Sequence, residues 1–328
     1  MDVIIKESHK YIMIQVKKEG VILRKSKLVF EADGVLNPAV IVEDDKINIF
    51  YRAVRKGNYS SIGHCIMSDP LTINERCEIP FLFPQYDYES QGMEDPRIVK
   101  IDGLFYLTYT AYDGINALGA LATSTDLKHF EKRGIIVPQV TEDVFRHLAE
   151  AKGDVMEKYF RIHLPDQLVK KSDQKVLMWD KNVIFFPRRV NGKLLFLHRI
   201  RPGIQLASIN ELTDLTKEYW DDYFLHFHDH ILLDSKHEHE SSYIGGGCPP
   251  IETEHGWLLI YHGVRDTPTG YIYSACAALL DLENPLIEIA RLPYALFGPE
   301  HDYEILGYVN NVCFPTGAIV ENDILYIY

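Results

Sequence analysis

Residues 92–114 read GMEDPRIVKIDGLFYLTYTAYDG, two apolar runs joined by an Asp-Gly pair. Asp and Gly tolerate the positive φ of a tight two-residue turn, and β-branched and aromatic residues favour the flanking strands. The stretch therefore predicts a β-hairpin. Its first strand opens on a charged group formed by Glu94, Asp95 and Arg97.

The same pattern recurs along the chain in four further segments. They read NPAVIVEDDKINIFYRAV from Asn37, DKNVIFFPRRVNGKLLFLHRIRP from Asp180, GGGCPPIETEHGWLLIYHGVRD from Gly245, and NNVCFPTGAIVENDILYIY from Asn310. Strand-like pieces such as GALATSTDL lie between the hairpins. Five four-stranded units at a period of roughly 60 residues predict an all-β fold, a five-bladed β-propeller forming a single catalytic domain over residues 1–328. A β-sandwich with an appended domain is the alternative.

One segment departs from the strand pattern. Residues 141–172 place apolar side chains at helical spacing, among them Val144, Phe145 and Leu148. We expect a helical insertion there. It could pack against the propeller wall, or it could cover the active face as a lid or subunit contact.

Composition limits the classes of partner. The chain of 328 residues has a formal net charge of −13, which argues against nucleic acid. Its five cysteines are scattered and suggest neither disulfides nor a zinc site. The sequence contains no stretch of about 20 apolar residues, so it predicts no membrane-spanning helix. We expect a cytoplasmic protein, or a periplasmic one if a signal peptide has been removed, that needs no cofactor and can form a homo-oligomer.

In a propeller, the inner strands begin beside the central channel, so residues at the hairpin openings should converge on one funnel. Paired carboxylates with amide, guanidinium, imidazole and aromatic groups suit carbohydrate chemistry, in which one acid protonates the glycosidic oxygen. The candidate substrate contacts are Asn37, Arg52, Glu94, Arg97, Tyr112, Asp113, Asp180, Lys181, His198, Arg199, Tyr243, His262 and Asn311. His198 and His262 have no third ligand at zinc-like spacing, so we expect no metal site.

These motifs resemble glycoside hydrolase family 130, the inverting β-mannoside phosphorylases and β-mannosidases. The likeness is carried by GMEDPRIVKIDGLFYLTYTAYDG, IFFPRRVNGKLLFLHR, GGGCPPIETEHGWLLIYHGV and AALLDLENPL. The resemblance implies a five-bladed propeller and makes Asp95 the general acid. In the phosphorylases this acid reaches the glycosidic oxygen through a mannose hydroxyl.

Two departures from the family pattern favour a hydrolase. Leu118 and Tyr243 stand where the resemblance implies basic phosphate ligands. A hydrolase of the inverting type needs a second carboxylate as base, and Glu240 is the candidate, with Glu238 as an alternative. The leading hypothesis is thus an exo-acting β-mannosidase for β-1,2-linked mannosides.

Two other hypotheses remain open. Lys181, Arg199 and Arg201 could bind phosphate by another geometry, which would make the protein a β-mannoside phosphorylase. Arg188 and Arg189 are expected near a hairpin turn, away from the funnel. A carbohydrate-binding propeller without catalysis is the third possibility. The sequence feature in its favour is the end of the chain at ILYIY, because the family pattern normally continues beyond this point. The N-terminal segment YIMIQV could close the last blade instead.

Overall fold

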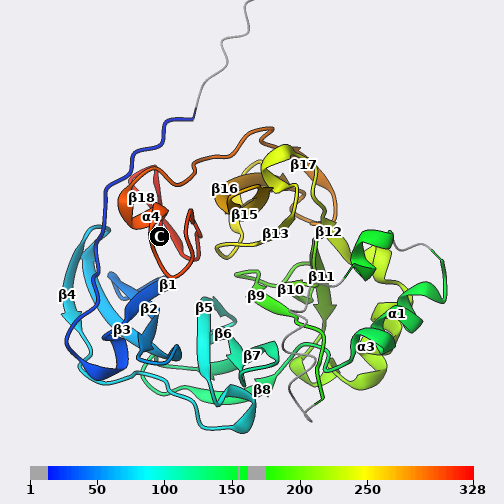
Figure 1. The fold of residues 1–328 in the computed structure, drawn as a ribbon, viewed down its shortest axis with the longest axis horizontal. Helices are drawn as coiled ribbons and strands as arrows, with labels where there is room; N and C mark the ends of the chain where they lie inside the picture. Colours follow the sequence, from blue (N-terminus) through cyan, green and yellow to red (C-terminus); the bar gives the residue numbers. More distant parts are fainter. Residues whose placement is uncertain (1–13, 154–155, 162–174) are drawn as a thin grey trace, which may run out of the picture.

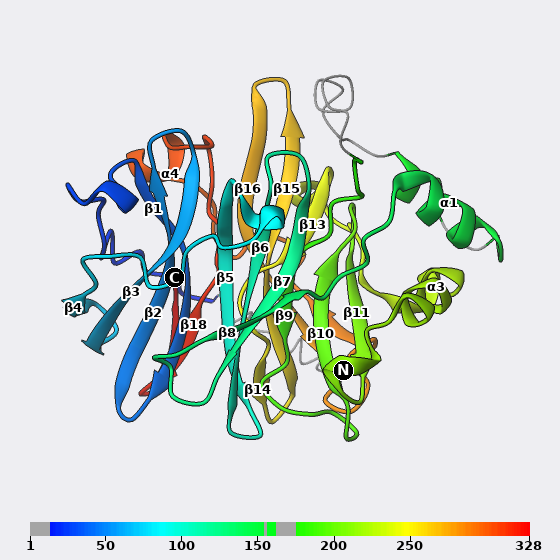
Figure 2. The same cartoon turned by 90° about the horizontal axis from the view of Figure 1, so that it is seen from below.

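The computed structural model describes residues 14–153, 156–161 and 175–328, and its regular structure is mostly β. The sheets follow one another around a ring in chain order (Figure 1), and their strands run along the depth of that ring (Figure 2). This is the propeller-like arrangement that the repeated hairpins predict. None of the described helices is long and apolar enough to cross a membrane.

The first two repeats form one eight-stranded sheet, joined by the single parallel pair Ser60–Gly92. Its strands are β1 (Gly34–Glu43), β2 (Lys46–Arg55), β3 (Tyr59–Asp69), β4 (Thr72–Arg76), β5 (Gly92–Ile101), β6 (Leu104–Tyr112), β7 (Ala117–Ser124) and β8 (Glu131–Ile135).

Three smaller sheets complete the ring. The third repeat contains β9 (Lys181–Phe185), β10 (Leu194–Arg199), β11 (Ile204–Ile209) and β12 (Ile231–Leu233). The fourth contains β13 (Tyr243–Gly246), β14 (Ile251–Thr253), β15 (Gly256–Thr267), β16 (Gly270–Leu280) and β17 (Glu288–Arg291). The last is the pair β18 (Ala318–Glu321) and β19 (Ile324–Ile327). Ile14–Val16, the described end of YIMIQV, form no strand beside this pair.

The hairpin turns confirm the chemistry predicted for them. Asp44 and Asp45, between β1 and β2, have φ of 50° and 56°, and Asp102 and Gly103, between β5 and β6, have φ of 50° and 82°. Positive φ at both central residues matches the right-handed twist of the strands that a two-residue turn connects. Local turn chemistry therefore fixes the register of these hairpins.

The two longest described helices lie on the outside of the ring, beside the sheet of the third repeat (Figure 1). Within the predicted insertion, α1 (Glu142–Glu150) and the 3-10 turn η3 (Glu157–Phe160) are helical, whereas residues 154–155 and 162–172 lie outside the described residues. Phe145 of α1 is fully buried, and its ring centroid lies 5.2 Å from that of Phe224 on α3 (Lys217–Leu225). Figure 1 places both helices away from the centre of the ring, so α1 packs against the wall.

The other helical segments are short. They are α4 (Asp302–Ile305) and the 3-10 turns η1 (Val29–Glu31), η2 (Asp87–Glu89), η4 (Leu212–Asp214), η5 (Phe227–His230) and η6 (Glu238–Glu240).

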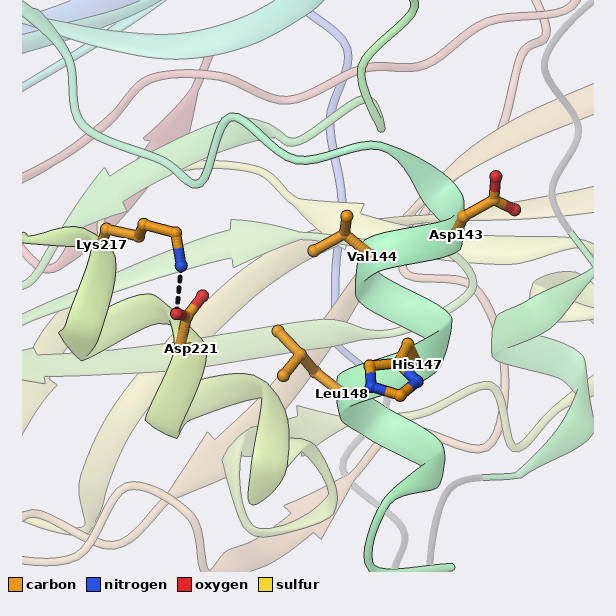
Figure 3. A pocket seen from close by; sticks show the side chains of 6 residues that line it. All are labelled: Asp143, Val144, His147, Leu148, Lys217 and Asp221. Atoms are coloured by element: carbon orange, nitrogen blue, oxygen red, sulfur yellow. Dashed lines mark hydrogen bonds and ion pairs between the residues drawn. The ribbon is translucent and has the colours of Figure 1, made fainter.

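A cavity of about 300 Å³ lies between α1 and α3. Figure 3 shows Val144 and Leu148 of α1 facing the ion pair of Lys217 and Asp221 on α3. Because both helices lie outside the ring, this cavity is remote from the hairpin openings (Figure 1).

Candidate active site

Four of the five hairpin openings carry an Asn or Asp in the left-handed backbone region. Asn37, Asp95, Asn182 and Asn311 have φ of 48°, 50°, 60° and 58°. Such a conformation costs a non-glycine residue on the order of 1 kcal/mol, and it is most accessible to Asn and Asp. In β1 and β5 it coincides with a break in register, a bulge that redirects a side chain. The Nδ2 of Asn37 consequently donates to Oδ1 of Asp95 at 2.7 Å.

Arg52 holds the two carboxylates of the EDPR motif. Its guanidinium lies 2.7 Å from Oε1 of Glu94 and 3.6 Å from Oδ1 of Asp95. Burial raises the pKa of Glu94, and the attraction of Arg52 only partly offsets it. Burial also acts to raise the pKa of Asp95, but Arg52, Lys181 and the Asn37 hydrogen bond outweigh it, so this pKa is lowered. The pKa values of the two neighbouring acids are thus pushed apart, as in sites that divide acid and base work.

Further cations surround this pair. Desolvation lowers the pKa of Lys181 to about 8; Glu94 and Asp95 oppose that shift, and Arg199 and Arg201 add to it. Arg199 is 5% exposed, and its Nη1 lies 3.3 Å from Nε2 of His262. Among the described residues, the cluster contains two carboxylates, those of Glu94 and Asp95. It contains five basic side chains, those of Arg52, Arg97, Lys181, Arg199 and Arg201. The cluster therefore carries excess positive charge.

Three buried donors in this cluster have no acceptor among the described residues. They are Nη2 of Arg97, Nε of Arg199 and Nδ1 of His262. Desolvation, together with Arg199 and the other cations, holds the pKa of His262 well below its usual value, so its ring is neutral. With Nε2 facing the Arg199 guanidinium, the ring proton belongs on Nδ1. Because buried polar groups are normally paired, these donors favour an anionic or hydroxyl-rich ligand.

Three further predicted residues, Tyr112, Asp113 and Asn311, make local contacts, and the carbonyl of Asn311 accepts the N–H of Tyr273 at 2.9 Å. Tyr112 is partly exposed and donates to the carbonyl of Gly114 at 2.9 Å. Asp113 accepts the backbone N–H groups of Ile115 and Asn116, at 2.8 and 2.6 Å, which shapes the turn after β6.

Asp180 and His198 face the protein core. Oδ2 of Asp180 lies 2.8 Å from Nδ1 of His198, whose Nε2 lies 2.7 Å from the hydroxyl of Tyr223 on α3. Asp180 and His198 are both fully buried. His198 and Arg199 are consecutive on β10, so their side chains point to opposite faces of the sheet. The prediction that Asp180 and His198 contact sugar does not agree with this placement, because their polar atoms bond each other, Tyr223 and a backbone N–H.

Glu240 is also absent from the Asp95 cluster. Its carboxylate accepts the N–H groups of Lys236 and His237, at 2.7 and 3.1 Å, and the hydroxyl of Tyr261. It also pairs with Arg291 at 3.3 Å. Tyr261 and His262 are consecutive on β15, so Glu240 lies on the face of the sheet opposite His262. A carboxylate so fully engaged is poorly suited to activate water.

A related set of residues occurs in two other repeats, although in the set of Glu89 the tyrosine hydroxyl has no hydrogen-bond partner among the described residues. We name it the Glu–Tyr–cation latch: a fully buried Glu that ends a 3-10 turn, a Tyr on the second long strand and a cation on the outer strand. Its members are Glu31, Tyr51 and Arg76; Glu89, Tyr109 and Lys132; and Glu240, Tyr261 and Arg291. The repetition indicates a structural role that does not depend on substrate.

Glu240 also belongs to a possible metal-ligand group. His239, Glu240 and Cys276 place ligand atoms within 4.8 Å of one another. The Glu240 carboxylate already accepts its own donors, so we assign the group to packing.

Four residues near the cluster were outside the predicted set. Asn182 shares the bulge conformation, Phe314 packs at a tilt against His262 with ring centroids 4.3 Å apart, and the Trp179 ring lies 4.9 Å from the ammonium group of Lys181. The Tyr273 hydroxyl lies 2.7 Å from that of Tyr243. Only Asn182 had a sequence signal, its position in the repeated hairpin opening.

Arg188 and Arg189 lie apart from this cluster, as predicted. Arg188 pairs with Glu252 and Arg189 with Asp102 and Glu211, at the ends of hairpins. Leu118 is 3% exposed and belongs to the apolar core between the second and third repeats.

Comparison with known proteins supports the resemblance seen in the motifs. The family model described as beta-1,4-mannooligosaccharide phosphorylase, that of glycoside hydrolase family 130, matches residues 10–328. A 1,2-beta-oligomannan phosphorylase of Thermoanaerobacter sp. (strain X514) is 30% identical over 331 residues, 96% of this chain and 93% of that protein. A beta-1,2-mannobiose phosphorylase of the same organism is 32% identical over 315 residues, 91% of this chain and 87% of that protein.

Solved structures share the fold. The beta-1,2-mannobiose phosphorylase of Listeria innocua, in complex with beta-1,2-mannobiose, aligns with a TM-score of 0.66 at 24% identity, over 90% of this chain and 86% of that one. A second structure comes from work on glycoside hydrolases of the GH130 family that target beta-1,2 mannosidic linkages in Candida mannan. It aligns with a TM-score of 0.70 at 22% identity, over 94% of this chain and 87% of that one. The chain belongs to glycoside hydrolase family 130.

Proposed function

We propose that this protein is an inverting β-mannoside phosphorylase that cleaves β-1,2-linked mannosides with inorganic phosphate and releases mannose 1-phosphate. The observation that carries the proposal is the excess of cations beside Asp95, with three buried donors that find no acceptor in the described part of the chain. Arg and Lys are the usual ligands of phosphate, and a dianion would neutralise this charge. The relatives that match nearly the whole chain are named phosphorylases of β-1,2-linked mannosides.

In the proposed reaction an oxygen of phosphate attacks the anomeric carbon of the mannosyl residue. The bond from that carbon to the glycosidic oxygen breaks, and the proton of Asp95 passes to the leaving oxygen, through a hydroxyl of the bound mannose as the family resemblance implies. Attack from the face opposite the leaving group inverts the configuration and gives the α-phosphate.

Phosphate binding also helps to explain how Asp95 acquires its proton. The lowered pKa of Asp95 is due to Arg52 and Lys181, which outweigh its burial. A bound phosphate dianion counters these charges, so the pKa of Asp95 rises when the nucleophile is in place. We infer that Asp95 becomes a competent acid only in the phosphate complex.

A β-mannosidase is less well supported. It requires a base, and the carboxylate proposed for that role, Glu240, is engaged in a latch that two other repeats share. Glu238, the alternative, is exposed and pairs with Arg265. Phosphorolysis needs neither group, because phosphate is itself the nucleophile. A binding propeller without catalysis would not explain the opposed pKa shifts of Glu94 and Asp95.

We also infer that the chain acts as one five-bladed propeller domain. The eight-stranded sheet counts as two blades joined by one residue pair, the sheets of the third and fourth repeats count as one blade each, and β18–β19 counts as the fifth. The shared latch in the first, second and fourth units supports this division.

The test is to incubate the protein with β-1,2-mannobiose with and without phosphate and to quantify mannose 1-phosphate and free mannose. The proposal predicts that cleavage requires phosphate and yields one mannose and one mannose 1-phosphate. Cleavage to two molecules of free mannose at a rate independent of phosphate would refute it.

A further inference from the structure

Arg201 is not among the residues assigned above to sugar binding or acid catalysis. Its charge nevertheless acts on Lys181 and Arg199, so it belongs to the cation cluster. It is partly exposed, and its guanidinium carbon lies 3.9 Å from the centroid of the Tyr243 ring. The guanidinium carbon of Arg199 lies 5.2 Å from the same ring. One aromatic side chain thus holds two guanidinium groups, although like charges repel.

No carboxylate among the described residues pairs with either guanidinium. The pKa of Arg199 is lowered by desolvation first and by the nearby charge of Arg201 second, and Asp95 opposes this shift only in part. Two like charges are kept together when an anion joins them, and the planar guanidinium group binds two phosphate oxygens at once.

The neighbouring tyrosines add a donor at the same place. The hydroxyls of Tyr243 and Tyr273 lie 2.7 Å apart, so one donates to the other and the second keeps a free proton. Gly245 allows the groups to converge. A Cβ atom at this position would lie 2.8 Å from Nη1 of Arg199 and 2.6 Å from the His262 ring.

We propose that Arg201, stacked on Tyr243, is a phosphate ligand that closes the anion site on its solvent side, with Arg199 beneath it and the Tyr243–Tyr273 hydroxyl pair as an additional donor. This inference rests on the proposed phosphorylase function and specifies its nucleophile site. It gives position 243, where Tyr replaces the basic residue that the family resemblance implies, a role in holding the cation. Asp95 and the mannose contacts do not depend on it.

The experiment measures the Michaelis constants for phosphate and for β-1,2-mannobiose in Arg201→Ala, Arg201→Lys and Tyr243→Phe. The matched control is Arg188→Ala, which removes an arginine paired with Glu252 away from the cluster. Calorimetric titration of each folded variant with inorganic phosphate alone provides a readout that does not need turnover.

We expect Arg201→Ala to raise the KM for phosphate by about 10- to 100-fold, the loss typical of a charge-assisted hydrogen bond, with the KM for mannobiose changed less than threefold. Arg201→Lys should recover part of the affinity, Tyr243→Phe should lose a few-fold, and Arg188→Ala should behave as the parent protein. A phosphate-dependent parent enzyme with an unchanged phosphate KM in Arg201→Ala overturns this inference alone. A parent enzyme indifferent to phosphate overturns the proposed function as well.

Discussion

Replacement of Glu240 by Gln distinguishes a structural carboxylate from a catalytic base. The change is nearly isosteric but removes the charge that faces Arg291, which is 2% exposed in its side chain. Loss of one partner from a buried ion pair costs roughly 3–5 kcal/mol. Arg291 keeps Glu288 at 2.7 Å, so we expect the lower end, about 3 kcal/mol.

The other two latches provide matched controls. Glu31→Gln and Glu89→Gln remove equivalent carboxylates, which face Arg76 and Lys132. All three variants should lose stability in urea unfolding by a similar amount, which corresponds to a midpoint lowered by about 1 M at a slope near 3 kcal/mol per M. The kcat per folded molecule should stay within two- to threefold of the parent value in each.

A different pattern would refute the latch interpretation. If Glu240→Gln lowers kcat by 100-fold or more while Glu31→Gln and Glu89→Gln do not, and its unfolding midpoint is unchanged, then Glu240 acts on the reaction. The β-mannosidase hypothesis would then be restored.

Three further predictions concern the site. Asp95→Asn should lower kcat by about 10²- to 10⁴-fold, because it removes the proposed general acid, and calorimetry should find mannobiose affinity within a few-fold. A variant with full kcat would exclude the role. The KM for phosphate should rise above about pH 8, because the Lys181 ammonium group, whose pKa is lowered to about 8, loses its charge as the pH rises through that value. Lys181→Met should flatten the dependence of this KM on pH. An unchanged pH dependence in Lys181→Met would disprove the assignment of the pH effect to Lys181. His198→Phe should destabilise the fold by roughly 1–3 kcal/mol in chemical unfolding, because it leaves buried Asp180 without its imidazole partner. The kcat/KM should change less than threefold. A large loss of kcat/KM at unchanged stability would show that His198 acts in the active site.

The repeated hairpins were predictable because their turns depend on neighbouring residues. Asp-Asp, Asp-Gly and Asn-Gly pairs specify a positive φ whatever the rest of the chain does. The openings of the hairpins were predictable for the same reason, since Asn37 and Asp95 each precede a proline that cannot continue a strand ladder. Asn182 has no such proline and was overlooked.

The face to which each strand residue points was harder to predict. His198 and Arg199 are neighbours, and a one-residue shift in register exchanges which of them enters the core. A bulge between β10 and β9 decides which of the two side chains faces the core, and it depends on contacts between the strands. The sequence pattern therefore predicted that both residues face the funnel.

The role of Glu240 could have been found by comparing the repeats. Glu31, Glu89 and Glu240 each come shortly before a hairpin whose second strand carries Tyr51, Tyr109 or Tyr261. The excess of cations around Asp95, in contrast, joins Arg52 of the first unit and Arg97 of the second with the cations of the third unit, so it requires the folded ring.

The ratio of mannose 1-phosphate to free mannose formed from β-1,2-mannobiose at saturating phosphate distinguishes a phosphorylase from a hydrolase, and NMR gives the anomeric configuration of the mannose 1-phosphate. A phosphorylase of the inverting type predicts equal amounts of the two products, with the mannose 1-phosphate in the α configuration. Free mannose without mannose 1-phosphate would show that water is the nucleophile and that the protein is not a phosphorylase.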